Sequence, residues 1–485
     1  MAGACLGGAA LNVGTLASFA AAPLAASLVA LAIWLRRGPA DPQAGWLVAT
    51  GGLSAVLGLS LILGGALGAG LLATGVGLAV IFTGAQLGLE AEDLPPGVRI
   101  REPLSVKLNA AVAVDEAMRW VEHTRSIISP KAPPRAYADA LRAAAERHRD
   151  QGWLEHPERA HPVPPALEKL ETRRDWVRGV GRAEFLRFES EYEPNDPEIH
   201  KAFLGVGCNR TAHAALWRHS GEPRPTLLCV HGYAMGRVGF DARVFGVRWL
   251  HQELGLDVAT VVLPLHGPRS QGRRSGEGFL GRHPLWTNAA VGQTIWELRR
   301  LTGWLRSQGA PAVGVYGLSL GGYVTALLAS LDNRLACAIP GVPFASWADL
   351  VLRGLSEDER LAAAAVGVTR AVLEDAWAPY APLSHTPRVA PRARLIVAGV
   401  ADRICPPAQA HALWEHWDRP AIHWFPGSHL MPLDRERTRR RLAAHLQDTL
   451  LSAGEEPLPL TRFRAGQGAL VGSGPTERGN GAGRG

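Results

Sequence analysis

With 485 residues, 47% of them hydrophobic, the chain is long enough for one large domain with a sizeable core and for further helical segments. Its formal net charge of +7 at pH 7 comes mainly from arginine, and because these residues are not interleaved with aromatic ones, the composition argues against a nucleic-acid partner. The five cysteines, an odd number, argue against a disulfide framework and agree with a reducing compartment.

The N-terminal 90 residues are strongly apolar. Residues 42–89 contain no charged side chain, and an earlier apolar segment covers residues 16–35, directly before Arg36 and Arg37. Because a membrane-spanning helix needs about 20 apolar residues, residues 1–90 predict two or three membrane spans. The alternatives are a signal peptide, disfavoured because no basic residue precedes the first segment, and a soluble helical hairpin.

The orientation in the membrane depends on the number of spans. By the positive-inside rule, Arg36 and Arg37 stay on the cytoplasmic side of the first span. Three spans then return the rest of the chain to the cytoplasm, whereas two leave it outside. We expect a bacterial inner-membrane protein whose main domain is cytoplasmic.

Residues 91–184 are predicted to form a helical connector. Amphipathic patterns cover residues 108–128, 134–151 and 165–178, and prolines separate them. The region holds no cluster of residues typical of catalysis. We therefore expect it to link the membrane region to the next domain or to cover part of that domain.

Apolar strands are predicted at residues 226–230 and 258–263. The first is followed by His231 and Gly232. The second precedes a loop with four arginines: Arg269, Arg273, Arg274 and Arg282. Guanidinium groups bind carboxylate or phosphate through paired hydrogen bonds, so the first three are candidates for binding an anionic ester such as a phospholipid. A solvated surface loop is the alternative.

The most informative stretch is residues 313–322, where an apolar segment leads into a Gly-x-Ser-x-Gly motif and a helical pattern follows. Gly317 and Gly321 flank Ser319 at positions where a sharp strand-to-helix turn leaves no room for a Cβ. The N-terminal amides of the following helix point at Ser319 and would stabilise negative charge there. We expect Ser319 to attack carbonyl carbons.

A serine nucleophile needs a base and a carboxylate that orients the base. Asp402 follows the predicted strand at residues 393–400, and His429 follows the one at 421–425. Because the carboxyl ends of parallel strands open onto one sheet edge, we expect Ser319, Asp402 and His429 to meet there.

Other residues compete for these roles. Asp349, after the strand that follows the serine motif, is the rival acid. His423 is the rival base, although it lies inside a predicted strand. His161 and His266 have no metal-ligand spacing around them, so we expect core or loop roles, no metal site and no cofactor.

Two further segments complete the chain. Residues 344–383 have helical composition and are predicted to be a lid that walls the substrate pocket and excludes water. Residues 452–485, rich in glycine, proline and arginine, are predicted to be a disordered tail.

The pattern of residues 185–451 resembles the α/β-hydrolase superfamily of serine hydrolases, with esterases and lipases as the nearest types. It shows the His-Gly strand, the helix at 286–305 with one apolar stripe, the serine elbow, and the strands that carry the acid and the base, in this order. The resemblance implies a mostly parallel, doubly wound sheet with helices on both faces. It also implies an oxyanion hole made by the backbone N–H groups of Tyr233 and Leu320.

The residues and the resemblance together predict a membrane-anchored serine hydrolase. It would cleave a carboxylic ester, with lipid esters among the candidate substrates, through an acyl-enzyme. Thioesterase, peptidase and acyltransferase activities use the same machinery, and a non-catalytic membrane scaffold is the alternative of a different class.

Overall fold

The computed structural model describes residues 41–128, 134–280, 283–355 and 357–452. Nine strands in these residues form one sheet in the order β1-β2-β3-β5-β4-β6-β7-β8-β9. The strands are β1 (Glu171–Val177), β2 (Gly181–Glu189), β3 (Thr211–Trp217), β4 (Thr226–Val230), β5 (Asp257–Val262), β6 (Val313–Leu318), β7 (Leu335–Gly341), β8 (Leu395–Gly399) and β9 (Ala421–Phe425). The predicted first membrane segment, Arg36, Arg37 and nearly all of the tail lie outside the described residues.

The sheet combines a parallel part with an antiparallel edge. The six strands from β4 to β9 run parallel to one another, whereas β1, β2 and β3 form an antiparallel meander that joins the parallel part at β5. The central strands β4, β5 and β6 are buried almost throughout. Because these strands are covered on both faces, they are runs of apolar residues without polar alternation.

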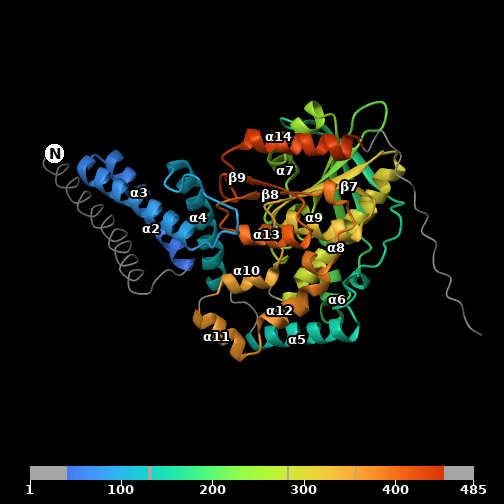
Figure 1. Cartoon of the computed structure of the whole chain (residues 1–485), viewed down its shortest axis with the longest axis horizontal. Coiled ribbons are helices and arrows are strands. Elements are labelled where there is room, and N and C mark those ends of the chain that lie inside the picture. Colours follow the sequence, from blue (N-terminus) through green and yellow to red (C-terminus); the bar gives the residue numbers. More distant parts are fainter. Residues whose placement is uncertain (1–40, 129–133, 281–282, 356, 453–485) are drawn as a thin grey trace, which may run out of the picture.

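Helices cover both faces of the sheet (Figure 1). On one face lie α7 (Val238–Val244) and α14 (Arg435–Leu446), and on the other lie α8 (Pro284–Ser307), α9 (Leu320–Leu331) and α13 (Pro407–His416). The apolar stripe predicted for α8 is buried as expected: Val291, Ile295, Leu298, Leu301 and Leu305. This confirms the predicted α/β-hydrolase fold with its doubly wound sheet.

One predicted helix is wrong. Residues 165–178 were expected to be helical, but β1 occupies Glu171–Val177 and pairs along its whole length with β2. Gly179, with φ of +80°, lies in the turn between the two strands. Cross-strand pairing through this turn overrides the amphipathic helical pattern of the segment. The sheet therefore begins inside the segment predicted to be a connector.

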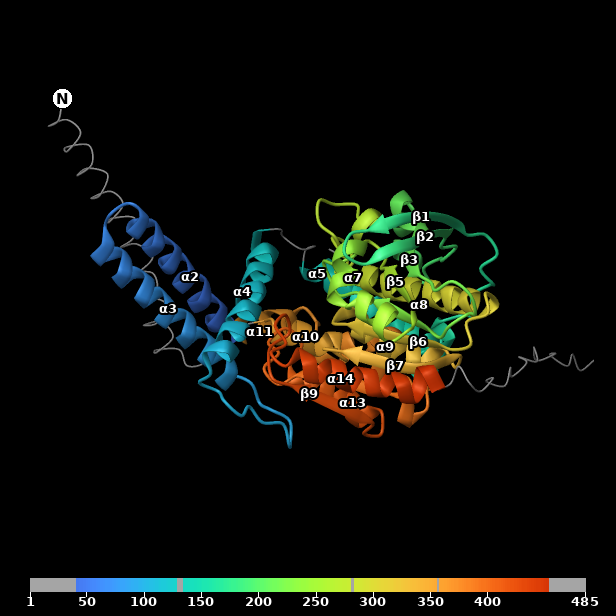
Figure 2. The same cartoon turned by 90° about the horizontal axis from the view of Figure 1, so that it is seen from above.

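The N-terminal part of the described chain is a hairpin of two long apolar helices, α2 (Asp41–Leu63) and α3 (Leu67–Glu90), which projects from the body (Figure 2). The two backbones touch at glycines: a Cβ on Gly77 would lie 2.6 Å from the carbonyl oxygen of Gly51. Residues Gln43–Leu63 and Leu67–Glu90 are each long and apolar enough to span a membrane. Small residues at such a contact allow helices to pack closely in lipid.

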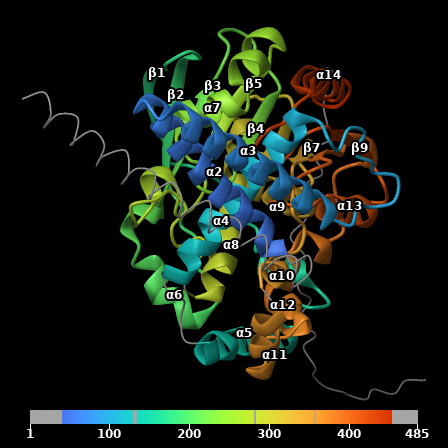
Figure 3. The ribbon, with the colours of Figure 1, turned by 90° about the vertical axis from the view of Figure 1, so that its left-hand side faces the viewer.

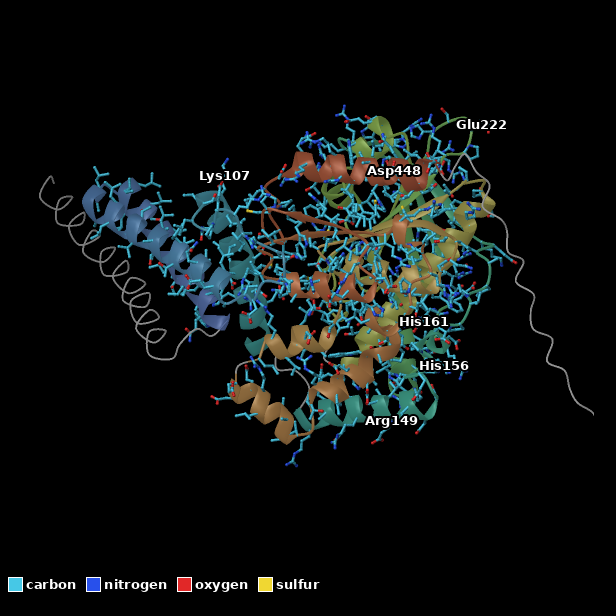
Figure 4. The ribbon with its side chains drawn as sticks, viewed as in Figure 1. Lys107, Arg149, His156, His161, Glu222 and Asp448 are labelled. Atoms are coloured by element: carbon cyan, nitrogen blue, oxygen red, sulfur yellow. The ribbon has the colours of Figure 1, made fainter. Side chains whose placement is uncertain are left out.

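The helix α4 (Val106–Ile128) lies between the hairpin and the body (Figures 2 and 3). Lys107, near its start, lies on the hairpin side of the body, whereas Glu222, which precedes β4, lies at the far end (Figure 4). Since Glu222 marks the amino end of the parallel strands, their carboxyl ends face α4. The N-terminal helices therefore adjoin the sheet edge at which the candidate site was predicted.

The remaining helices pack around this frame. They are α5 (Pro134–Asp150), α6 (Pro197–Leu204) and, in the segment predicted to be a lid, α10 (Trp347–Arg353), α11 (Glu357–Ala365) and α12 (Arg370–Trp377). Short helical turns are η1 (Pro157–Ala160), η2 (Gly207–Arg210), η3 (Trp249–Glu253), η4 (Gly267–Arg269), η5 (Ala378–Tyr380), η6 (Pro382–Ser384), η7 (Pro391–Ala393) and η8 (Gln447–Leu451). Arg149 of α5 forms an ion pair with Asp375 of α12, so the lid segment is tied to the N-terminal region.

Candidate active site

Ser319 occupies the sharp corner between β6 and α9. Its backbone has φ of +58° and ψ of −115°, a conformation that costs a non-glycine residue about 1–3 kcal/mol. A Cβ on Gly317 would lie 2.0 Å from the carbonyl oxygen of Gly321, and a Cβ on Gly321 would lie 1.9 Å from that of Val230. The corner can thus close only with glycine at both positions, as the motif predicts.

The surroundings of Ser319 suit the binding of an oxyanion. Leu320 is the first residue of α9, so its amide has no acceptor within the helix and belongs to the positive end of the helix dipole. On the other side, a Cβ on Gly232 would lie only 3.3 Å from the Cβ of Ser319. Tyr233, the next residue, is therefore beside the serine. The assignment of its amide as the second donor remains a prediction.

Asp402 and His429 meet at this edge. Nδ1 of His429 donates a hydrogen bond of 2.7 Å to Oδ2 of Asp402. The other carboxylate oxygen accepts the backbone amides of Ile404 and Cys405 at 3.0 and 2.7 Å, and Asp402 is 1% exposed. Because these amides fix the carboxylate, the imidazole has one orientation and one tautomer, with Nε2 left to accept a proton.

The thiol of Cys405 lies near both the serine and the histidine. This buried thiol interacts with both Ser319 and His429, while the described residues show no direct hydrogen bond between the serine hydroxyl and the imidazole. Burial opposes the imidazolium form of His429, but the charges of Asp402 and Cys405 and hydrogen bonds with both raise its pKa well above the usual value. Burial also raises the pKa of the Cys405 thiol.

Sequence comparisons place the chain among known proteins. The profile of the prolyl oligopeptidase family matches residues 305–425, which include Ser319 and Asp402. The chain is 38% identical over 371 residues to the uncharacterized protein MT2702 of Mycobacterium tuberculosis strain CDC 1551, covering 75% of this chain and 86% of the relative. The protein Rv2627c of strain H37Rv is 37% identical with the same coverage. The chain belongs to the family of these two mycobacterial proteins.

Two solved hydrolase structures are similar to this chain. An acetyl xylan esterase from Paenibacillus sp. R4 matches with a TM-score of 0.43 and 15% identity, over 61% of this chain and 94% of that chain. An acylaminoacyl peptidase from Pyrococcus horikoshii matches with a TM-score of 0.37 and 15% identity, over 59% and 42%. Together, the fold, the serine elbow and the family profile identify a serine hydrolase of the α/β-hydrolase type.

The rival acid, Asp349, and the rival base, His423, bond to other residues. Asp349 forms an ion pair with Arg370 and accepts a hydrogen bond from Gln409. His423 contacts the hydroxyl of Thr438 through Nε2, at 3.2 Å. Within the described part of the chain these two residues are not bonded to each other, whereas Asp402 and His429 are, so the latter pair remains the candidate acid and base.

The other buried histidines considered from the sequence hold loops in place. His231 is fully buried; its Nε2 accepts the amide of Leu263 at 3.1 Å and its Nδ1 donates to the carbonyl oxygen of Gly232 at 2.7 Å. Burial lowers the pKa of His231 to about 3, so the ring is neutral. The buried His161 and His266 likewise contact backbone carbonyl oxygens, those of Pro379 and Pro264.

The assignment of Arg269 to substrate binding is wrong. Its side chain is fully buried and forms two hydrogen bonds of 2.7 Å with the carboxylate of Glu297 on α8. It also donates to the carbonyl oxygens of Val262 and Asn209, which ties the loop after β5 to the sheet. Arg269 is therefore a structural residue, although the loop sequence does not distinguish it from the other arginines.

Arg273 and Arg274 do line a cavity, as residues of a binding site would. The cavity has a volume of about 770 Å³ and lies at the antiparallel edge of the sheet, beside the loop that follows Gly232. Three more exposed arginines line it: Arg173, Arg187 and Arg237. Arg282 lies outside the described residues.

A cluster of metal-binding residue types was not identified from the sequence. Side-chain ligand atoms of His219, His251 and Asp257 lie within 4.8 Å of one another. They are already paired, since Asp257 accepts two hydrogen bonds from His219 and Nδ1 of His251 donates to Leu256. Asp257 begins β5, so this cluster lies at the sheet edge opposite Ser319.

Sequence reasoning also missed Asp115. This acidic residue of α4 is fully buried and contacts the loops that carry Asp402 and His429. The only signal in the sequence is an acidic pair, Asp115 and Glu116, within an otherwise apolar helical stretch.

Proposed function

We propose that the chain hydrolyses a carboxylic ester through an acyl-enzyme intermediate. The observation that supports this most strongly is the 2.7 Å hydrogen bond between His429 and the buried Asp402, next to the strained corner of Ser319. An imidazole held in this tautomer can accept the proton of a serine hydroxyl, which is a weak nucleophile otherwise.

In the proposed reaction, Oγ of Ser319 attacks the carbonyl carbon as Nε2 of His429 takes the hydroxyl proton. The resulting oxyanion is held by the amides of Leu320 and Tyr233. The C–O bond of the ester then breaks, and His429 gives its proton to the leaving alcohol. In the second half, His429 takes a proton from water, the hydroxide attacks the acyl carbon, and the acid leaves with Ser319 restored.

The arginine cavity supports an anionic substrate. Five exposed guanidinium groups surround it, and among the described residues only Arg173 of these five forms an ion pair, with Asp175. Burial, and then the positive charges of Arg269 and Arg187, lower the pKa of His213 in the cavity wall to about 4. A phosphate or carboxylate would be attracted there. We propose that this cavity binds the anionic part of the ester, through Arg273 and Arg274 among others.

The helical hairpin supports membrane attachment. The side chains of Leu63, Leu72 and Val56 are 89, 66 and 60% exposed. Between Gln43 and Leu89 the two helices contain no charged residue. Burying such side chains in lipid is favourable. Both open ends of the hairpin face α4, and in the sequence Arg36 and Arg37 come shortly before α2, which begins at Asp41. The positive-inside rule then favours the cytoplasmic side of a bacterial inner membrane.

The enzyme hypothesis is tested with a fluorophosphonate probe on the full-length protein. Wild-type protein is expected to become labelled and Ser319→Ala is not. An unlabelled wild-type protein would favour the non-catalytic scaffold.

A substrate panel then separates the activities that share this machinery. The match to the prolyl oligopeptidase family makes peptidase the second candidate. p-Nitrophenyl esters and aminoacyl p-nitroanilides are compared, and turnover of the anilides but not the esters would replace esterase by peptidase.

The anion hypothesis is tested with a matched pair of esters, one with a terminal phosphate and one with a hydroxyl. Arg273→Ala and Arg274→Ala are expected to raise KM about tenfold for the phosphate ester only. The control is Arg440→Ala, an exposed arginine of α14 far along the chain from the cavity. Equal effects of all three substitutions would remove the cavity from the proposal.

A further inference from the structure

The side chain of Asp115 joins the two loops that carry the candidate acid and base. Its Oδ2 accepts the backbone amides of His429 at 2.8 Å and of Arg403, the neighbour of Asp402, at 3.1 Å. Its Oδ1 accepts the hydroxyl of Ser428 at 2.9 Å and the amide of Leu430 at 3.1 Å. Asp115 belongs to α4, which lies outside the sheet and its covering helices.

A carboxyl group suits this arrangement. Three backbone amides and the hydroxyl of Ser428, which also lies 2.9 Å from the carbonyl oxygen of Ala111, converge on its two oxygens. Asp115 is 0% exposed, so water cannot replace a lost acceptor. An asparagine has nearly the same shape, but its NH₂ group would point at two donors. A buried donor without an acceptor costs about 1–3 kcal/mol, and the loop would shift to avoid it. The shift would move His429 itself, since its own amide is one of the donors.

A second set of contacts fixes the loop of the acid from the same side. The guanidinium group of Arg403 is fully buried and forms ion pairs with Glu116 of α4, at 2.7 Å, and with Glu92, just after α3. Glu92 also pairs with Arg353 of α10, at 2.6 Å. A Cβ on Gly88 of α3 would lie 2.9 Å from a carboxylate oxygen of Glu116, so the apolar hairpin ends directly on this network.

We infer that the N-terminal helices complete the active site, with Asp115 as the positioning residue for both His429 and Asp402. The inference rests on the proposed role of these two residues in catalysis. It follows that the sheet and its covering helices are not sufficient for activity. The junction of α4 with the apolar hairpin sets the geometry of the acid and base loops.

The test compares Asp115→Asn with a matched control in full-length protein. The control is Asn109→Ala, because Asn109 is also buried in α4 but, within the described part of the chain, its side chain bonds only to Gln86, Pro103 and Ser105. For Asp115→Asn, kcat is expected to fall about 100-fold, the effect of misplacing a catalytic group by about 1 Å, while KM changes less than about threefold. For Asn109→Ala, kcat is expected to stay within about threefold of wild type.

The NMR signal of the Nδ1–H proton of His429 gives a second readout, because it reports the hydrogen bond with Asp402 directly. We expect it to be lost or shifted in Asp115→Asn and unchanged in Asn109→Ala. Should Asp115→Asn fail to fold, Ser428→Ala removes one of the four donors without a buried mismatch, and its kcat is expected to fall several-fold with KM retained.

Two outcomes would overturn the inference. One is wild-type kcat in Asp115→Asn; the other is an equal loss of kcat in Asp115→Asn, or in Ser428→Ala, and in the Asn109→Ala control. Both differ from failure of the proposed function, in which the wild-type protein itself neither reacts with the fluorophosphonate probe nor hydrolyses esters.

Discussion

Asp115 and His429 are 314 residues apart in the chain, and a hydrogen bond of 2.8 Å joins the carboxylate of the first to the backbone amide of the second. The contact connects a helix next to the apolar hairpin with the loop of the candidate base. Residues that flank the α/β-hydrolase fold thus enter its active edge. The contribution of Asp115 to stability should depend on pH.

Burial, and then the charge of Asp402, raise the pKa of Asp115 to about 6, from an ordinary value of 3.8. Because the folded protein binds this proton more tightly than the unfolded chain, Asp115 contributes more stability as pH falls from about 6 to 4. The free energy of unfolding of wild type minus that of Asp115→Asn should therefore increase over this range. Urea unfolding at pH 7, 6 and 5 measures it, and a difference independent of pH would contradict the assignment.

The pKa of His429 predicts where activity is lost in acid. The base must be neutral to accept a proton, and its pKa is raised above 6.5. We therefore expect kcat/KM to fall with an apparent pKa above 6.5 as pH decreases. In Asp402→Asn the imidazole loses its partner, and kcat should fall roughly 10⁴-fold, as in other serine triads. A pH profile flat down to pH 5 would exclude His429 as the base.

The thiol of Cys405 should influence the same profile. Its interaction with the imidazole raises the pKa of His429, so in Cys405→Ala the acid limb should move to lower pH while the protein stays active. The buried Cys337 of β7 provides the matched control, and Cys337→Ala should leave the limb in place. A complete loss of activity in Cys405→Ala would instead mean that the thiol takes part in the reaction.

Arg269 should matter for stability and not for substrate. In Arg269→Met the carboxylate of Glu297 stays buried without its partner, which should lower the free energy of unfolding by about 3–5 kcal/mol. The double variant Arg269→Met/Glu297→Leu should recover much of this loss, and KM for the phosphate ester should not change. Denaturant unfolding and steady-state kinetics on the same samples test both statements. An increase in KM without loss of stability would return Arg269 to the binding site.

The contact between α2 and α3 can be tested with two glycines of one helix. A Cβ on Gly77 would clash with the backbone of α2 at Ala55, whereas a Cβ on Gly75 would meet nothing within 4 Å. Gly77→Ala should therefore destabilise the hairpin by about 1–3 kcal/mol and Gly75→Ala should not. Thermal unfolding in detergent measures both. Equal melting temperatures would argue against this helix pair.

The local patterns of the chain predicted much of the site. A glycine two residues to each side of Ser319 indicates a corner too tight for a Cβ, and the apolar stripe of α8 indicates a helix packed on a sheet. The strand ends before Asp402 and His429 were visible as short apolar runs. Such features repeat or cluster within a few residues, so they can be read without knowledge of the fold.

Tertiary structure alone decided the features that depend on distant partners. Arg269 and Arg273 are arginines of the same loop. Only Arg269 is buried in an ion pair with Glu297, whereas Arg273 lines the cavity. The strand β1 exists because it pairs with β2, against its own helical appearance. Asp115 acquires its role from loops hundreds of residues away. A hydrogen bond or an ion pair stabilises only where both partners meet out of water, and that meeting is a property of the folded chain and not of any short stretch of it.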